Sequence, residues 1–418
     1  MILEIRLSNF FSIKDEIVLD MRAGNSKTQK VQNLQNNTFS YKDMQILKSV
    51  AIYGANASGK SNIIKAIRCC ISLILQSHTY NENIRFDYTP FKFEGYLHIN
   101  KPSSFYIRFV IGEVEYEYSF SFSLVQIISE SLYYYPNGRR AKIFTRNEYA
   151  GKDKSKIYSF SSAIRKPMDI AENTSTKTLY VSRASQMDRE IPKEVFKFFN
   201  EKFVLGYYLD APLVELLYRE NRETLLKALQ IADSDIVSVE MLKEKKPGKT
   251  FTVNVEANKA IMQDIQQTYL TFLTYHKANP DFAFDMATEE SSGTFMLFYI
   301  MLTVIDVVKN NKTLIIDELD ISLHTKIVEY ILSLFHASDA AQIIYTTHNT
   351  NLLNLNKLRK DQIYFVNKKD DASSDLYSLF DYKDFRDTMD VEKAYLQGRF
   401  DAIPYIDDSL NNLKSLIK

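Results

Sequence analysis

The feature that most constrains the fold is the octapeptide Gly54-Ala-Asn-Ala-Ser-Gly-Lys-Ser61, which fits the pattern G-x-x-x-x-G-K-[ST] in full. It follows an apolar, β-branched run at residues 46–53 and precedes helical spacing at residues 61–75. In a strand, turn and helix of this kind, backbone N–H groups surround phosphate oxygens and the helix N-terminus adds its dipole. The octapeptide therefore predicts a phosphate-binding turn, and a chance glycine-rich turn is the alternative.

Two residues of the turn have distinct expected roles. We expect Lys60 to reach the β- and γ-phosphates of a nucleotide and the Ser61 hydroxyl to ligate Mg²⁺. The residues expected to bind the nucleotide are Gly54, Ala55, Asn56, Ala57, Ser58, Gly59, Lys60, Ser61 and Asn62.

An apolar strand at residues 313–316 ends in two carboxylates, Asp317 and Glu318. At the carboxyl end of such a strand, Asp317 is expected to hold Mg²⁺ through water, and Glu318 to polarise the attacking water as general base. Buried strands often end in acidic residues, which is the competing interpretation. If both roles hold, the two halves of the site come from opposite ends of the chain and must fold together.

Two further motifs lie in the last third of the chain. Glu290-Ser-Ser-Gly-Thr294 precedes a long apolar helix, where it predicts a second anion site or simply a helix cap. His348 ends the apolar run at residues 344–347. Strands that alternate with helices imply a parallel sheet, so His348 is expected beside Glu318, close to a γ-phosphate. A single histidine is more often structural than catalytic.

Composition narrows the class of protein. Of 418 residues, 45% are hydrophobic and 25% charged, as in globular proteins. The 52 basic and 52 acidic residues balance, which argues against a dedicated polyelectrolyte binder but leaves a local basic patch open. Cys69 and Cys70 are adjacent, so they predict a reducing cytoplasm and no disulfide. The apolar stretch at residues 295–305 is too short to span a membrane and predicts a core helix.

The middle of the chain has a different character. Residues 86–132 alternate apolar and polar side chains, which predicts antiparallel strands. Residues 185–232 have helical spacing and predict a helical subdomain, and Pro247-Gly248 predicts a turn before a strand at residues 251–255. No sustained heptads are present, so no long coiled-coil arm is expected. We expect three parts, residues 1–95, 96–285 and 286–418.

The four motifs, in this order, resemble the ATP-binding-cassette (ABC) ATPases, and in particular the branch with SMC, RecF and OLD-type proteins. Asn9-Phe10 and the run from Asp317 to His324 also resemble that branch. The tail at residues 392–404 resembles the end of stand-alone ATPases of anti-phage defence operons, such as PARIS-type and RloAB-type systems. The resemblance covers about residues 1–95 and 285–405. It implies an α/β fold, an ABC-type P-loop ATPase head with a mixed sheet, an inserted antiparallel β region and a helical subdomain.

The resemblance also implies ATP and Mg²⁺ as cofactors and a dimer with two composite sites. Ser291, Ser292 and Gly293 of one protomer would close over the ATP bound by Lys60, Ser61, Asp317 and Glu318 of the other. The segment at Asp320 would cross the dimer interface, and His348 would be the switch histidine. One departure is the absence of a convincing glutamine-containing loop, whose place Thr89-Pro-Phe-Lys-Phe93 occupies.

The function expected from the resemblance is that of a slow ATPase, a sensor or scaffold of abortive infection. It would control a separately encoded effector, which we expect to be a nuclease, and it would respond to a phage product. A RecF-like DNA-repair clamp is the alternative, with basic runs at residues 139–142, 152–156 and 243–246. A transporter nucleotide-binding subunit and a globular protein with fortuitous motifs are weaker alternatives.

Overall fold

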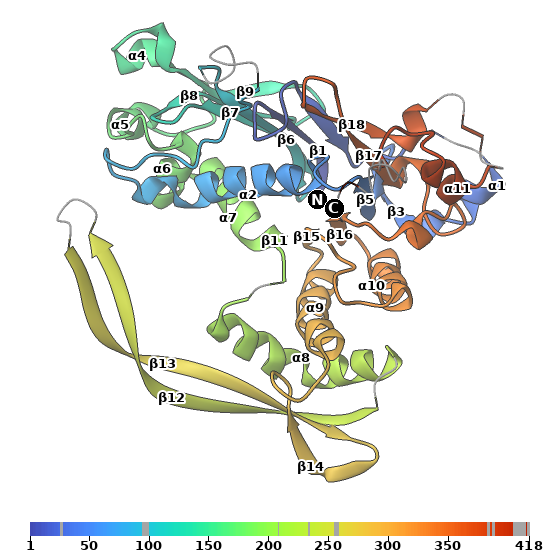
Figure 1. The fold of residues 1–418 in the computed structure, drawn as a ribbon. Helices are drawn as coiled ribbons and strands as arrows, with labels where there is room; N and C mark the ends of the chain where they lie inside the picture. The colour runs from blue at the N-terminus through green and yellow to red at the C-terminus, as the bar shows by residue number, and fades with distance from the viewer. Residues whose placement is uncertain are drawn as a thin grey trace. The chain divides into compact units, whose positions relative to one another are not determined.

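The computed structural model describes residues 1–25, 28–93, 100–207, 209–232, 235–254, 259–382, 385–386, 389–403 and 415. The tail motif therefore lies within the description except for Pro404. The chain forms two compact units, which are described separately (Figure 1). Unit 1 comprises Met1–Gly206, Asn311–Asp320 and Leu332–Lys418, and unit 2 comprises Tyr207–Asn310 and Ile321–Ile331.

A six-stranded, mainly parallel sheet forms one half of unit 1, in the order β11-β15-β16-β5-β17-β18. Only β18 is antiparallel to its neighbour. β15 and β16 have every residue buried, as strands of a parallel sheet covered on both faces do. The strands are β5 (Ser49–Gly54), β11 (Phe203–Leu205), β15 (Thr313–Ile316), β16 (Gln342–Thr346), β17 (Ile363–Lys368) and β18 (Ser374–Ser378).

The other half of unit 1 is a seven-stranded antiparallel sheet, in the order β10-β9-β8-β7-β6-β1-β2. The alternation at residues 86–132 predicted β6, β7 and most of β8, because alternate residues of such strands face the core. Its strands are β1 (Ile2–Ser8), β2 (Ile17–Asp20), β6 (Ser103–Ile111), β7 (Val114–Phe122), β8 (Ile127–Tyr134), β9 (Ala141–Asn147) and β10 (Tyr158–Phe160). A separate hairpin pairs β3 (Thr38–Tyr41) with β4 (Met44–Leu47).

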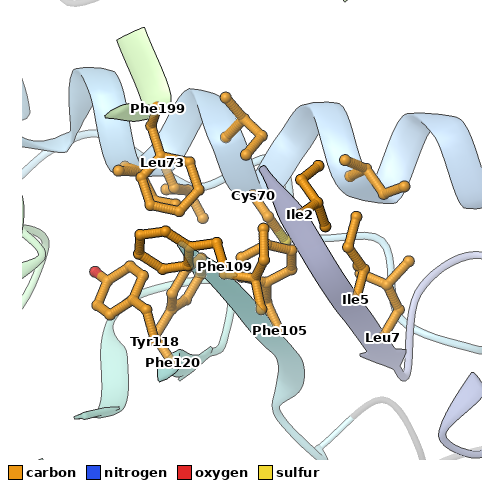
Figure 2. Packing of buried hydrophobic residues seen from close by; sticks show 14 of the residues in the cluster. Ile2, Ile5, Leu7, Cys70, Leu73, Phe105, Phe109, Tyr118, Phe120 and Phe199 are labelled. Carbon is orange, nitrogen blue, oxygen red and sulfur yellow. The ribbon is translucent and has the colours of Figure 1, made fainter. Parts of the chain in front are cut away.

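Helix α2 (Lys60–Gln76) runs over the core that these sheets share. Figure 2 shows Cys70 and Leu73 of this helix above Ile2 and Ile5 of β1, with Phe105 and Phe109 of β6 beside them. A buried side-chain amide joins the first and last thirds of the chain, since Gln342 accepts a hydrogen bond from Ile2 N (2.7 Å) and donates to Ile2 O (3.0 Å). The first and last thirds of the sequence therefore build one unit.

Shorter helices complete unit 1. They are α1 (Gln29–Gln32), α4 (Lys154–Ile157), α5 (Pro167–Glu172), α6 (Tyr180–Gln186), α7 (Glu190–Lys202), α10 (Thr325–Ala337), which begins in unit 2, and α11 (Val391–Leu396).

Unit 2 combines two helices with a long β-ribbon. The helices are α8 (Ala211–Ile231) and α9 (Ser292–Lys309), and the strands are β12 (Ile236–Asn254), β13 (Lys259–His276) and β14 (Asn279–Asp285). Figure 1 shows β12 and β13 side by side as an extended ribbon. The base of the ribbon packs on the helices, where Phe272 contacts Phe298 (ring centroids 4.6 Å apart) and Tyr218 (5.2 Å).

The expected fold class is confirmed, with three local corrections. Residues 185–232 do not form one helical subdomain, because β11 separates α7 in unit 1 from α8 in unit 2 and joins the parallel sheet beside β15. Pro247-Gly248 is not a turn: both residues lie within β12, opposite Gln266 and Ile265. Proline is tolerated there because β12 is an edge strand. The expected strand at residues 251–255 is part of the same β12, apart from Val255, which lies outside the described residues.

Among the described residues, α9 alone is long and apolar enough to cross a membrane. Half of it is buried inside the structure (50%), and core helices pass the same test. Its packing on Phe272 and Tyr218 agrees with the core helix expected from the sequence.

Candidate functional site

The phosphate-binding turn leaves the carboxyl end of β5 and runs into α2. Ala57 and Gly59 have positive φ angles of 63° and 116°, which fold the turn back on itself. Gly54 has no room for a side chain, since a Cβ there would lie 2.6 Å from Val366 O. Lys60 is buried, and its Nζ donates hydrogen bonds to the carbonyl oxygens of Gly54 (2.8 Å) and Ala55 (3.1 Å).

Two serines that the sequence analysis did not single out support this turn from behind. Ser374 Oγ lies 2.5 Å from Ser58 O and 2.7 Å from Ser12 Oγ. Ser12 Oγ also accepts a hydrogen bond from Asn62 Nδ2 (2.8 Å). A Cβ at Gly59 would overlap the Ser374 hydroxyl. Ser12 follows the noted Asn9-Phe10 pair, but no local pattern marks Ser374.

The acidic pair lies beside the turn because β15, β16 and β5 are consecutive strands of the sheet. Thr346, the last residue of β16, connects the pair to the sheet. Its Oγ1 donates to Asp317 Oδ1 (2.6 Å) and accepts from Glu318 N (2.7 Å), and its carbonyl accepts from Leu319 N (3.1 Å). Glu318 has a positive φ of 53°, a strained conformation for a non-glycine residue. Thr346 therefore fixes how both carboxylates leave the strand.

Lys60, Asp317, Glu318, Asp320 and His348 form one electrostatic group in unit 1. Burial lowers the pKa of Lys60 to about 8, although the three carboxylates act in the opposite direction. Partial burial and the charge of Lys60 also lower the pKa of His348, again against the three carboxylates. The structure thus brings together every predicted site residue of unit 1.

Asp320 adds a feature that the sequence did not predict. Its Oδ1 is buried and has no hydrogen-bond partner among the described residues, as is also true of the hydroxyls of Tyr53 and Tyr345. Burial raises the pKa of both tyrosines, and the charge of Asp320 adds to the effect. Tyr53 directly precedes the turn and Tyr345 directly precedes Thr346.

The residues around Ser291 belong to unit 2. Ser291 caps α9, with its Oγ accepting from Thr294 N (3.0 Å), and both Ser291 and Ser292 are exposed. Gly293 lies against the backbone of Ser322, whose carbonyl oxygen would be 3.1 Å from a Cβ at this position. The expected cap is therefore present, with the two serines accessible at the helix N-terminus.

The donors in unit 1 fit a nucleotide and Mg²⁺. Ser58 Oγ is buried within the turn without a partner among the described residues, and the backbone curves around Lys60. The Ser61 hydroxyl and the Asp317 carboxylate are oxygen donors of the kind that Mg²⁺ prefers. The described residues contain no cluster of three or more His, Cys, Asp or Glu that could hold a metal ion.

Residues 89–93, which occupy the place expected for a glutamine-containing loop, are attached to the segment between β1 and β2. Phe11 N donates to Thr89 O (2.7 Å), and Phe91 N donates to Asn9 Oδ1 (3.0 Å). Asn9 of the noted pair thus holds residues 89–91 against the N-terminal strands.

Comparison with known protein families identifies one match. A family described as "AAA domain, putative AbiEii toxin, Type IV TA system" matches residues 49–354, a range that includes the turn, the acidic pair, Ser291 and His348. No curated protein sequence matches the chain.

Solved structures of SMC heads are similar at low identity. An SMC head bound to the C-terminal winged-helix domain of ScpA is 17% identical, with a TM-score of 0.41, over 94% of this chain and 99% of that one. The SMC head domain from Thermotoga maritima is 12% identical, with a TM-score of 0.40, over 90% and 98% of the two chains. An Smc head with an extended coiled coil, bound to the C-terminal domain of ScpA from Pyrococcus furiosus, is 16% identical, with a TM-score of 0.40, over 100% and 99%.

Proposed function

We propose that this protein is an ATP-hydrolysing, ABC-type sensor or scaffold of cytoplasmic anti-phage defence. The premise is that the chain belongs to the family described as "AAA domain, putative AbiEii toxin, Type IV TA system". In this proposal residues 1–95 and 286–418 form the ATPase lobes, and residues 96–285 form the inserted region. The protein controls a separately encoded effector, for which we propose a nuclease, and responds to a phage product.

One observation carries the ATPase part of the proposal. The buried ammonium of Lys60 shares one end of a parallel sheet with Asp317, Glu318 and His348. A buried cation on a turn of inward-facing amides binds phosphate, and a carboxylate beside it supplies the base for hydrolysis. The family description supports the defence role.

Each residue then has a defined task. The amides of residues 54–62 and the Lys60 ammonium bind the phosphates, and Ser61 and Asp317 hold the cation. When bound, Mg²⁺ neutralises charge that develops on the β- and γ-phosphate oxygens. Glu318, oriented by Thr346, accepts the proton of the attacking water, and His348 contacts the γ-phosphate. Ser291, Ser292 and Gly293 of a second copy complete the site.

The native mass of the Glu318→Gln protein, with and without ATP and Mg²⁺, tests this proposal. A rise from monomer to dimer on ATP would support the composite site, and a larger assembly that persists without ATP would support a scaffold. A monomer under both conditions would contradict both. The matched control is Lys60→Ala in the same background, which should not respond to ATP. Turnover on the order of tens per second without a partner would contradict a slow sensor.

The alternative, a RecF-like DNA clamp, needs free basic side chains. Several members of the basic runs are paired instead: Arg140 with Glu117 (2.7 Å), Lys243 with Glu215 (2.6 Å) and Lys246 with Glu244 (2.7 Å). Affinity for duplex DNA that falls steeply with salt would nevertheless favour the clamp over the defence role.

A further inference from the structure

The segment that begins α9 is attached to the β-ribbon within unit 2. The Glu290 carboxylate directly precedes Ser291 and is only 10% exposed. Its Oε1 is 2.7 Å from His276 Nε2 and also accepts a hydrogen bond from the buried Thr274 hydroxyl. Both donors, Thr274 and His276, lie near the end of β13. A carboxylate from the helix segment is thus held by the end of the ribbon.

His276 bridges two carboxylates. Its Nδ1 is 2.8 Å from Asp235 Oδ1, just before β12, and its ring packs edge-on against Phe284 of β14 (5.1 Å). Ionised carboxylates only accept hydrogen bonds, so both ring nitrogens must carry a proton for both contacts to form. Burial works against this charge, but the hydrogen bonds to Asp235 and Glu290 raise the pKa of His276. Among the described residues, Asp235 and Glu290 are the charged groups that act on the ring.

The packing around this bridge gives the segment little room to move separately from the ribbon. Phe272 of β13 packs on Phe298 and Tyr299 of α9, with ring centroids 4.6 and 6.4 Å apart. Its carbonyl accepts a hydrogen bond from Met286 N (2.9 Å), in the loop between β14 and α9. The contact between β13 and the α9 segment is therefore polar at Glu290 and apolar further along the helix.

We propose that His276, in its doubly protonated form, is a positioning residue that holds Ser291 and Gly293 in the geometry needed to close on the nucleotide of a second copy. The inference rests on the proposed function, because it assigns a regulator to the same composite site.

The test uses the full chain with Glu318→Gln, and dimerisation with ATP and Mg²⁺ is measured by mass photometry. Adding His276→Phe keeps an aromatic ring against Phe284 but removes both hydrogen bonds, and should weaken dimerisation roughly 10- to 100-fold. Binding of a fluorescent ATP analogue by the monomer should not change, because unit 1 supplies that site. Equal dimerisation with and without His276→Phe would overturn the inference.

The pH profile separates positioning from simple structural support. A histidine with a raised pKa contributes below that pKa and ceases to contribute as the pH rises through it. The parent protein should therefore lose dimer affinity across this titration. The side-chain amide of His276→Gln can donate to one of the two carboxylates at every pH. This variant should therefore restore part of the dimer affinity that His276→Phe loses, and its affinity should not change with pH over the same range. A parent profile that matches that of His276→Gln would refute the role.

Two controls keep the result interpretable. Tyr275→Phe removes the neighbouring hydrogen bond to Glu240 (2.9 Å) without touching Glu290, and should dimerise like the parent. Amide hydrogen exchange at residues 290–295 should be faster in His276→Phe. Unchanged exchange would show that His276 does not hold this segment. If the parent itself stays monomeric with ATP, the composite site fails, while the exchange measurement still decides whether His276 holds the segment.

Discussion

Replacing Thr346 by valine tests how the acidic pair is oriented. The change keeps the shape of a fully buried side chain but removes its hydrogen bonds to Asp317 Oδ1 and Glu318 N. A hydrogen bond to an ionised group contributes about 1.5 to 3 kcal/mol and one to a neutral amide about 1 kcal/mol. The free energy of unfolding should therefore fall by about 2.5 to 4 kcal/mol.

Catalysis should suffer more than binding in this variant. Without the amide contact, Glu318 is free to relax from its positive φ of 53°, and a misplaced base loses rate. We expect ATP hydrolysis to fall roughly 10- to 100-fold, part of the 10²- to 10⁴-fold that a general base supplies. Because Lys60 and the turn are untouched, the dissociation constant for ATP should change little.

The assay combines urea unfolding, steady-state phosphate release and titration with a fluorescent ATP analogue. Thr347→Val is the matched control, because this neighbour is equally buried and its hydroxyl accepts a hydrogen bond from the neutral backbone N–H of Asn349 (3.0 Å). It should cost about 1 kcal/mol and retain most of the rate. If Thr346→Val hydrolyses ATP like the wild type, or if both variants lose the same rate, Thr346 does not orient Glu318.

Three further predictions concern the phosphate-binding turn. Gly59→Ala should abolish nucleotide binding and lower the Tm, because a Cβ would overlap the Ser374 hydroxyl. The control is Gly112→Ala: Gly112 also has a positive φ (57°), but it has open space around it. Calorimetry should therefore show that this control loses only about 1 to 2 kcal/mol of stability. Lys60→Ala should abolish ATP binding, whereas Glu318→Gln should bind ATP and lose hydrolysis; equal loss of binding in calorimetric titrations would contradict these roles. Since burial lowers the pKa of Lys60 to about 8, the free protein loses this cation as the pH rises, and ATP affinity should fall by up to about tenfold per pH unit above that value; a flat titration to alkaline pH would argue against Lys60 as the phosphate ligand.

The site in unit 1 was predictable because its motifs are local. The spacing of Gly54, Gly59 and Lys60 sets a turn that only certain residues can adopt, and Asp317 and His348 each follow an apolar strand. Parallel strands bring their carboxyl ends to one edge of a sheet, so their convergence followed from strand and helix order. Among the antiparallel strands, β6, β7 and most of β8 followed from the alternation of side chains at residues 86–132.

Long-range contacts were decided only by the tertiary structure. Ser12 and Ser374 meet behind the turn from opposite ends of the chain. The single Thr346 hydroxyl donates to the Asp317 carboxylate and accepts from the backbone N–H of Glu318. The three residues of β11 are too few to show a period, so their place in the sheet depends on pairing with β15. Pro247 joined β12 because an edge strand leaves its missing N–H without consequence.

The sequence by itself thus determined a phosphate-binding turn, an acidic strand end and a helix cap, because each depends on residues within a few positions of one another. The tertiary structure decided how the acidic pair is aimed, what supports the turn, and that His276 ties the ribbon to Glu290. Such hydrogen bonds depend on where whole strands and helices lie in the folded protein. The spacing of neighbouring residues in the sequence does not determine those positions.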